Sequence, residues 1–281
     1  MSPVRVPGNG DKSPIFVPGK GPSVLCLHGF TGTPYEVAPL ARALAAAGFA
    51  VSAPLLEGHG ENAAALAATR WQDWLASAEE AFDRLRAGAG GGPVAIAGFS
   101  MGGLLALRLA RRRPGAVPAL VLMSVPLRLP EWQVAILRGF SRLPGFLRRN
   151  PWATLHKREG SDVTDAHVRD ENPSLAEMPL AGLAELVELA ETARRDLSFL
   201  RMPVLVAHGE RDRTVAQSAS FELAGSLASN VVERLWLPRS GHLIAVDVER
   251  ALLCETAVRF LSSHAGSSAA ANHVLDDGQA T

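Results

Sequence analysis

The fold of this chain is decided at residues 93–103, which read PVAIAGFSMGG. The apolar run 93–97 predicts a buried strand, and the spacing of the apolar residues in 104–111 predicts a helix. Between them stands Gly-Phe-Ser-Met-Gly, and a Gly-x-Ser-x-Gly pattern between a strand and a helix is typical of a nucleophile elbow. So tight a turn strains the serine backbone, turns its hydroxyl away from the chain and leaves no space for side chains at Gly98 and Gly102. We therefore predict that Ser100 is the nucleophile of a serine hydrolase.

A loop near the start of the chain supplies a candidate oxyanion hole. Residues 28–32, HGFTG, end the apolar run 24–27 and so lie at the carboxyl end of a predicted strand, where open α/β sheets collect their ligand sites. The backbone N–H of Phe30 can face the same crevice as Ser100, and the N–H of Met101 directly follows the nucleophile. Two such donors form an oxyanion hole. An ordinary glycine-rich turn after a strand is the alternative interpretation of this loop.

A serine hydroxyl becomes a strong nucleophile only when a nearby base takes its proton, and that base needs an acid to orient it. The candidate acid is Asp212, which follows the buried-strand run 203–207, and the candidate base is His242, which follows a later strand-like run. Glu210 in the same turn and Asp196 in a helical pattern are the other acids weighed, and the strand-end position favours Asp212. The chain order is therefore serine, acid, histidine.

Taken together, these motifs resemble those of the small carboxylesterases and monoacylglycerol lipases of the bacterial α/β-hydrolase superfamily. The resemblance covers about residues 15–261, and its motifs are LHGFTG at 27–32, EGHG at 57–60, GFSMGG at 98–103, GERD at 209–212 and SGH at 240–242. It implies the catalytic assignment given above, ester substrates and a cap over the site. The stretch 127–180 diverges most from that pattern, so the identity of the substrate stays open.

Short apolar runs alternate with helical patterns along the chain, which predicts βα units and a largely parallel sheet. The predicted strands are 14–18, 23–28, 49–53, 93–98, 119–124, 203–208 and 231–237. The predicted helices are 34–47, 70–87, 101–113, 182–200, 215–228 and 246–262. We therefore expect the α/β class and the α/β-hydrolase fold, a mostly parallel central sheet flanked by helices, with a helical cap inserted after the sixth core strand. The expected divisions are a first core part at 1–126, a cap at 127–180, a second core part at 181–262 and a disordered tail at 263–281.

The alternation stops in the cap, where short helices are expected at 131–140, 142–149 and 162–170. Ligand pockets are concave and mainly apolar, so we expect apolar side chains of the cap to line an acyl pocket, namely Trp132, Ile136, Phe140 and Phe146. The cap also carries basic residues that could meet an anionic lipid surface. A solvated charged face is the favoured interpretation, because interfacial binding also needs exposed apolar surface.

Other polar residues near the candidate site are expected to be structural. We interpret His28, His59 and His208 as histidines that order loops or fill the core, because most single histidines have no direct role in chemistry. Asp247 and Glu249 follow His242 too closely to orient it, and we expect them to cap the final helix.

Composition bounds the classes of function. The chain has 281 residues, 47% of them hydrophobic and 20% charged, which fits a soluble globular protein. The net charge is zero and the pI is near 7.1, so nothing suggests a nucleic-acid partner. The sequence contains no run of 18 apolar residues, so no transmembrane helix is expected. Residues 1–12 lack the apolar core of a secretory signal. We therefore expect a cytoplasmic protein without stable membrane insertion. Cys26 and Cys254 are expected to be buried thiols. No metal or cofactor is expected, and nothing indicates the oligomeric state.

The expected function is hydrolysis of carboxylic esters of short- to medium-chain acyl groups through an acyl-enzyme, that is, a carboxylesterase acting on a small-molecule ester. A monoacylglycerol lipase is the nearest alternative. A C–C hydrolase, a cofactor-free haloperoxidase and a non-enzymatic ligand receptor stay open, because fold alone does not separate them. Haloalkane dehalogenases and epoxide hydrolases are disfavoured, since their nucleophile is an aspartate and this elbow carries Ser100.

Overall fold

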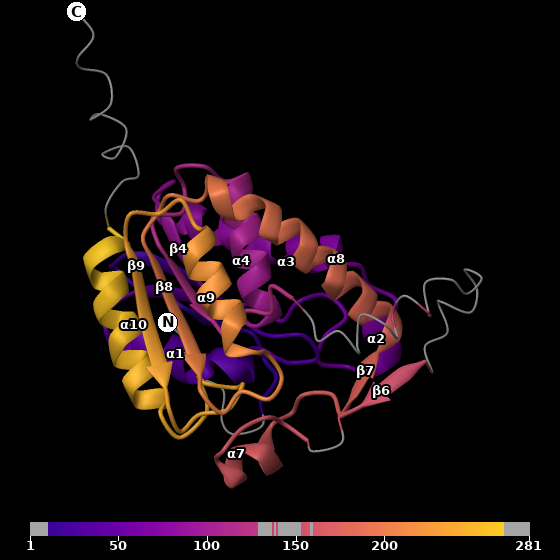
Figure 1. Ribbon diagram of the computed structural model, residues 1–281. Helices are drawn as coiled ribbons and strands as arrows, with labels where there is room; N and C mark the ends of the chain where they lie inside the picture. The colour runs from indigo at the N-terminus through magenta and orange to yellow at the C-terminus, as the bar shows by residue number, and fades with distance from the viewer. Residues whose placement is uncertain (1–10, 129–136, 138, 140–152, 158–159, 267–281) are drawn as a thin grey trace, which may run out of the picture.

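A seven-stranded sheet forms the centre of the molecule in the computed structural model (Figure 1), which describes residues 11–128, 137, 139, 153–157 and 160–266. The strands lie in the order β1-β3-β2-β4-β5-β8-β9, and every neighbouring pair is parallel except β1 with β3. Their bounds are β1 Ile15–Val17, β2 Ser23–Leu27, β3 Ala50–Ala53, β4 Val94–Phe99, β5 Leu120–Met123, β8 Val204–Gly209 and β9 Val232–Leu237. All seven predicted strands are confirmed, each within one residue at either end.

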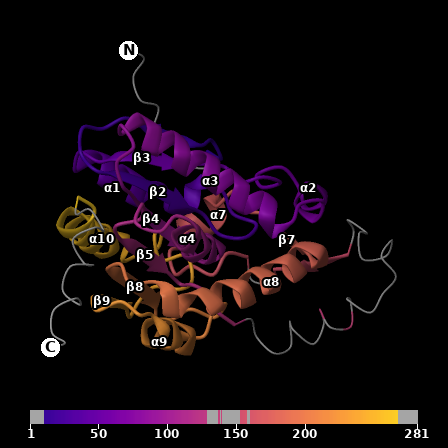
Figure 2. The same cartoon turned by 90° about the horizontal axis from the view of Figure 1, so that it is seen from above.

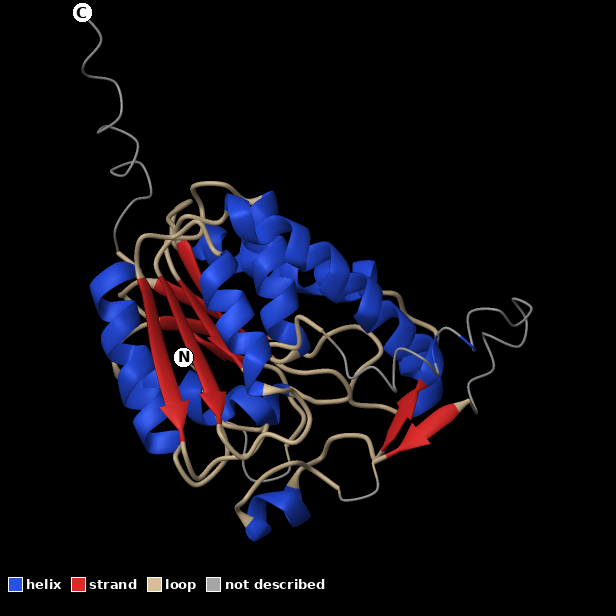
Figure 3. Ribbon diagram, in the orientation of Figure 1, coloured by secondary structure: helices blue, strands red, loops and turns tan. Residues whose placement is uncertain are grey.

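Helices cover both faces of the sheet (Figures 2 and 3). On one face pack η1 (Pro34–Val37), α1 (Ala38–Ala46) and α10 (Arg250–His264), and on the other α3 (Trp71–Gly88), α4 (Met101–Arg112), α8 (Leu180–Asp196) and α9 (Gln217–Ser226). The short helices η2 (Leu197–Phe199) and α2 (Ala63–Ala67) lie on the same face as α3, α4, α8 and α9. Helix α2 was not predicted. Strands buried on both faces are continuous apolar runs, which is why the sequence located them so closely.

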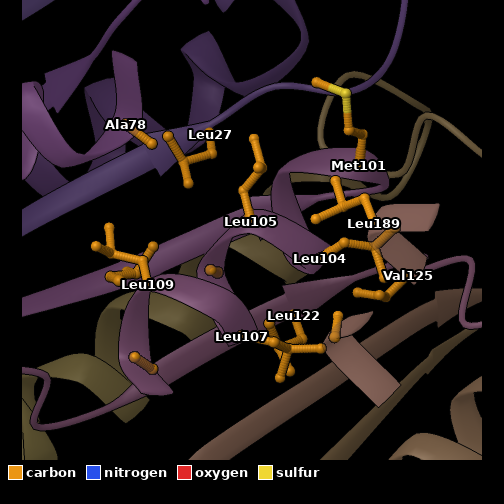
Figure 4. Close-up of a cluster of buried hydrophobic side chains, with 14 of the residues drawn as sticks. Leu27, Ala78, Met101, Leu104, Leu105, Leu107, Leu109, Leu122, Val125 and Leu189 are labelled. Atoms are coloured by element: carbon orange, nitrogen blue, oxygen red, sulfur yellow. The ribbon is translucent and has the colours of Figure 1, made fainter. Parts of the chain in front are cut away.

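Helix α4 lies at the centre of the larger core (Figure 4). Leu104, Leu105, Leu107 and Leu109 are all fully buried, and they pack among side chains of β2, β5, α3 and α8. Burying a leucine stabilises a fold by about 2 kcal/mol, so these four hold the start of the helix firmly against the sheet. Because Ser100 directly precedes the helix, its backbone is held in place with it.

A long insertion follows β5, which is the fifth strand of this chain, and ends at α8; the sequence placed it after the sixth core strand. Its described part contains an antiparallel pair of strands, β6 (Thr154–His156) and β7 (Glu177–Pro179), and the helix α7 (Ala166–Glu171) between them. In Figure 1 the arrows of β8 and β9 point to the side on which α7 lies, so this part of the insertion sits beyond the carboxyl ends of the strands.

Two expectations for the insertion need correction. The helix expected at 162–170 begins only at Ala166, because the side chain of Asp165 accepts a bond from the His167 N–H and caps the helix there. The strands β6 and β7 were not predicted, since three-residue strands carry too little alternation to be recognised. The helices expected at 131–140 and 142–149 lie outside the described residues apart from positions 137 and 139.

At the end of the chain, α10 runs to His264, two residues beyond the predicted core. Disorder was expected from residue 263 onward, but residues 263 and 264 belong to α10. Residues 267–281 lie outside the described part of the chain. Cys26 and Cys254 are both buried free thiols, as predicted. Among the helices of the described residues, none is both long and apolar enough to cross a bilayer.

The glycine at position 102 gives a direct test of how closely β2 and α4 approach. In Gly102→Ala the added methyl carbon would lie 2.3 Å from the carbonyl oxygen of Leu27, so the backbone must shift, and we expect a loss of about 1–3 kcal/mol in the free energy of unfolding. Gly225→Ala is the control, because its methyl would meet nothing within 4 Å on an exposed face of α9, and a gain of about 0.5–1 kcal/mol is expected there. Urea unfolding measures both, and equal effects would contradict the close approach.

Candidate active site

Ser100 stands alone between the last residue of β4 and the first of α4, with φ 51° and ψ −119°. This positive φ is strained for a residue with a side chain. A Cβ atom at Gly98 would lie 2.3 Å from the carbonyl oxygen of Gly102, and the chain can turn so tightly only because both positions are glycine. The steric expectation for this turn is therefore confirmed.

The structure brings Ser100, His242 and Asp212 together. The Nε2 atom of His242 lies 3.1 Å from the Ser100 hydroxyl oxygen, and its Nδ1 atom lies 2.8 Å from Oδ2 of Asp212. All three side chains are buried. Since a carboxylate only accepts hydrogen bonds, Nδ1 carries the imidazole proton and Nε2 presents its lone pair to the serine hydroxyl. This arrangement can take the proton from the hydroxyl.

The charges of the pair favour proton transfer in that direction. Burial opposes protonation of His242, but the Asp212 carboxylate outweighs it and raises the pKa of the imidazole above its ordinary value. Burial likewise opposes ionisation of Asp212, but the positive charge and the hydrogen bond of His242 hold the pKa of that carboxyl below its ordinary value. The Asp212 carboxylate therefore stabilises the imidazolium that forms when His242 takes a proton.

The second oxygen of Asp212 is held by the backbone. Oδ1 accepts the N–H of Thr214 at 2.9 Å and that of Val215 at 2.7 Å. His208 lies below it, with Nε2 3.2 Å from the Val215 carbonyl oxygen and 3.4 Å from Oδ2 of Asp212. Its Nδ1 is bonded to the Ser220 hydroxyl at 2.8 Å, so His208 is the hydrogen-bonded core histidine that the sequence predicted.

The two other candidate acids lie elsewhere. Glu210 is exposed, and Asp196 forms an ion pair with Arg108 on α4. Of the three acids weighed from the sequence, Asp212 is thus the one whose carboxylate reaches His242.

The loop that carries Phe30 leaves β2 beside the elbow, because Leu27 of β2 pairs with Gly98 of β4. The Gly29 carbonyl oxygen is bonded to Nδ1 of His28 at 2.9 Å and to the Gly32 N–H at 3.1 Å. A trans peptide points its N–H away from its carbonyl oxygen, so the N–H of Phe30 is turned the other way. Among the described residues neither this N–H nor that of Met101 has a hydrogen-bond partner, which leaves both free for a ligand.

His28 and His59 support this loop from below. Nε2 of His28 accepts the Leu56 N–H at 3.1 Å, and burial lowers the pKa of His28 to about 3. His59 packs edge-on against the rings of His28, Phe30 and Trp74, and burial lowers its pKa to about 4. Both are neutral and structural at neutral pH.

Asp247 and Glu249 correct an expectation, because neither caps the final helix. Asp247 accepts the N–H groups of Gly241, Thr164 and Asp165 at 2.7 to 3.0 Å. Glu249 stands at the start of α10 without a capping bond, and its carboxylate accepts the hydroxyl of Ser240 instead. Both carboxylates hold the loop that carries His242.

The inserted segment reaches the loop of the acid as well. Asp162 accepts the N–H of Arg213 at 2.8 Å and the hydroxyl of Thr214 at 2.9 Å, and its own carbonyl oxygen accepts the Leu243 N–H at 3.1 Å. Asp162 was not among the residues predicted for the site. Its partners lie more than 50 positions away along the chain, so no local pattern marks it.

The four expected pocket residues, Trp132, Ile136, Phe140 and Phe146, lie outside the described residues. Within the described part of the chain, no group of three or more histidine, cysteine, aspartate or glutamate side chains could hold a metal ion.

Comparison with known proteins gives consistent matches over most of the chain. The family model described as Hydrolase_4: Serine aminopeptidase, S33 matches residues 20–249. A thermostable monoacylglycerol lipase of Bacillus sp. (strain H-257) is 30% identical over 255 residues, which cover 89% of this chain and 95% of the lipase. A carboxylesterase of Bacillus subtilis (strain 168) is 25% identical over 248 residues, which cover 88% of this chain and 95% of the esterase.

Among solved structures, one reported for LipS and LipT, two metagenome-derived lipolytic enzymes, superposes with a TM-score of 0.81 at 27% identity. It covers 90% of this chain and 98% of that chain. The similarity therefore spans the sheet, the loops described above and the region of the insertion.

The titration of His242 tests the electrostatics of the site without reference to any substrate. In the wild type, NMR of the imidazole should show a pKa above about 6.5, the ordinary value, with the proton held at Nδ1 at higher pH. In Asp212→Asn the opposing charge is gone and burial dominates, so the pKa should fall below that value.

Glu210→Gln is the matched control, since it removes a carboxylate two positions away that is exposed to solvent. It should leave the pKa of His242 unchanged. A shift in the control, or none in Asp212→Asn, would overturn the assignment of the partner.

Proposed function

The chain belongs to the Hydrolase_4 (serine aminopeptidase, S33) family of α/β-hydrolases, and we propose that it is a serine esterase of that family. The substrate is a carboxylic ester with a short- to medium-chain acyl group, and the reaction runs through an acyl-enzyme, as in a carboxylesterase. The observation that carries the proposal is the hydrogen-bonded series from Ser100 through His242 to Asp212, with the serine in a strained turn.

The proposed reaction begins when Nε2 of His242 takes the hydroxyl proton and Ser100 attacks the ester carbonyl. The N–H groups of Phe30 and Met101 bind the oxygen that becomes negatively charged. The imidazolium then gives its proton to the leaving alcohol, and an ester joins the acyl group to Ser100. Water, deprotonated by the same histidine, cleaves this ester and restores the serine.

Each group has a definite energetic role in this scheme. Asp212 holds the tautomer of His242 and stabilises the imidazolium, for which its low pKa and its depth in the fold suit it. Losing one oxyanion donor typically lowers the rate by about 10²–10³-fold, so the free N–H groups of Phe30 and Met101 each make a large contribution to the rate. The reaction calls on no group beyond these residues and water.

A monoacylglycerol lipase is the second candidate, and a specific observation favours it. The lipase of Bacillus sp. is 30% identical to this chain, whereas the esterase of Bacillus subtilis is 25% identical, with similar coverage. Both candidates use the same chemistry at Ser100. They differ in the leaving group, which is glycerol in one case and a simple alcohol in the other.

Replacement of the nucleophile tests the chemistry. Ser100→Ala should lower the turnover of p-nitrophenyl butyrate by at least about 10⁴-fold, because without the nucleophile no acyl-enzyme forms. Ser124→Ala is the matched control, since Ser124 is also buried and also has a positive φ, at 48°, and it should keep wild-type turnover. Turnover that survives in Ser100→Ala would rule out this serine as the nucleophile.

The chain-length dependence tests the substrate class. We expect kcat/KM for p-nitrophenyl esters from acetate to palmitate to peak at short or medium acyl chains. A peak at long chains, or hydrolysis of monoacylglycerol at a comparable rate, would replace the carboxylesterase by the lipase. Absence of turnover on every ester, in protein that remains folded, would remove both and leave C–C hydrolysis or ligand binding to be examined.

A further inference from the structure

Glu36 is a buried carboxylate for which the proposed reaction has no use. It lies in η1 and is only 5% exposed. Burying a charged group is costly unless hydrogen bonds and opposite charges compensate it. Such a residue in contact with the loop that carries Phe30 therefore calls for an explanation.

The glycine-rich loop is wrapped around this carboxylate. Oε2 of Glu36 accepts the N–H of Gly29 at 2.9 Å. A Cβ atom at Gly32 would lie 2.0 Å from the same oxygen, and one at Gly29 would lie 3.1 Å from it. The carboxylate thus occupies the space that side chains at both positions would need, and it holds the His28–Gly29 peptide, which adjoins the peptide that carries the Phe30 N–H.

The inserted segment holds the other side of the carboxylate. Oε1 accepts a hydrogen bond from the Ser174 hydroxyl at 2.9 Å. The N–H of the next residue, Leu175, donates to the carbonyl oxygen of Thr31 at 3.0 Å. Lys157 donates from Nζ to the hydroxyl oxygen of Thr31 at 2.6 Å. Thr31 itself has a φ of 63°, a strained value that persists only where the surroundings enforce it.

Both oxygens of Glu36 act as acceptors, so the carboxylate form suits its neighbours. Burial raises the pKa of this carboxyl, while the Gly29 N–H and the charge of Lys157 act in the opposite direction. Lys157 is partly buried, and the burial of its amine lowers the pKa of that group. The two charges sit on different sides of the loop, one from the core and one from the insertion.

We propose that Glu36 is a positioning residue of the esterase proposed above: through Gly29 it orients the oxyanion N–H of Phe30, and through Ser174 it makes that orientation depend on the docked inserted segment. The proposal rests on the proposed function only in taking Phe30 as the oxyanion donor. It makes the insertion a part of the catalytic machinery, in addition to any part it has in binding substrate.

The proposal has an electrostatic signature because Glu36 also acts on the base. The carboxylates whose charges raise the pKa of His242 are those of Asp212, Asp162 and Glu36. Of these three, Glu36 has the smallest effect, so removing its charge alone should move the acidic limb of the kcat/KM profile only slightly to lower pH. A residue that only fills space would not produce this shift.

The test compares variants of the full-length protein with p-nitrophenyl butyrate as the probe. Glu36→Gln, which keeps the size of the side chain and removes its charge, should lower kcat about tenfold or more with KM within about twofold, and should shift the acidic limb to lower pH. Ser174→Ala should lower kcat in the same direction without the pH shift, because the charge remains. Glu185→Gln is the control: Glu185 also accepts a backbone N–H, that of Trp71, but it has no hydrogen bond to residues 28–32, and the variant should change neither quantity.

Two outcomes would overturn the proposal. One is a folded Glu36→Gln protein with kcat within twofold of the wild type. The other is a loss of activity in which KM changes as much as kcat and the pH profile stays in place. If Glu36→Gln fails to fold, Ser174→Ala carries the test, and wild-type kcat in that variant overturns the coupling to the insertion.

A second measurement separates this proposal from the proposed function. A fluorophosphonate probe labels an activated serine and needs the same oxyanion donors, but no ester substrate. If no ester is turned over, the ratio of labelling rates in wild type and Glu36→Gln still decides the role of Glu36. A ratio of about ten or more supports it, and a ratio near one overturns it. Ester turnover with equal labelling rates would retain the esterase and remove only the positioning role.

Discussion

The carbonyl oxygen of Leu27 lies where the side chain of residue 102 would begin, and the site is arranged around this close approach. It brings the end of β2 against the start of α4, so the loop with Phe30 lies beside the turn with Ser100. The glycines at 98 and 102 permit the contact, and the buried leucines of α4 maintain it. A strained serine and two free N–H groups thereby lie at one end of the sheet, before any partner of the serine is considered.

The parallel sheet brings the remaining groups to the same end. Asp212 follows β8 and His242 follows β9, and the carboxyl ends of parallel strands meet at one edge. The described part of the insertion then bonds to each of the three loops. It reaches the Phe30 loop through Leu175 and Lys157, and the loops of the acid and the histidine through Asp162. The core supplies the groups, and the insertion ties their loops together.

The sequence predicted the central strands closely because they are largely apolar runs. It predicted which residues meet because Ser100, Asp212 and His242 each follow a predicted strand. It did not single out Glu36, although Glu36, Leu40 and Leu44 follow one another at a spacing of four, which in the single helix predicted at 34–47 would place the carboxylate on the buried face. The helical spacing could have identified it. Asp162 could not have been identified in this way, since its role comes from contacts between distant parts of the chain. The start of α7 was misplaced for the same reason: residues 164 and 165 give their N–H groups to Asp247 before the helix begins.

The contacts of residues 157–175 also define how this protein can be recombined with its relatives. A chimaera that exchanged the whole insertion would lose the partners of Glu36, Arg213 and Asp247 together, and buried polar groups without partners are costly. A junction placed before Lys157 would keep all of these bonds. The framework that holds the site therefore extends into the second half of the insertion. The portion that can be exchanged without breaking these bonds is shorter than the insertion itself.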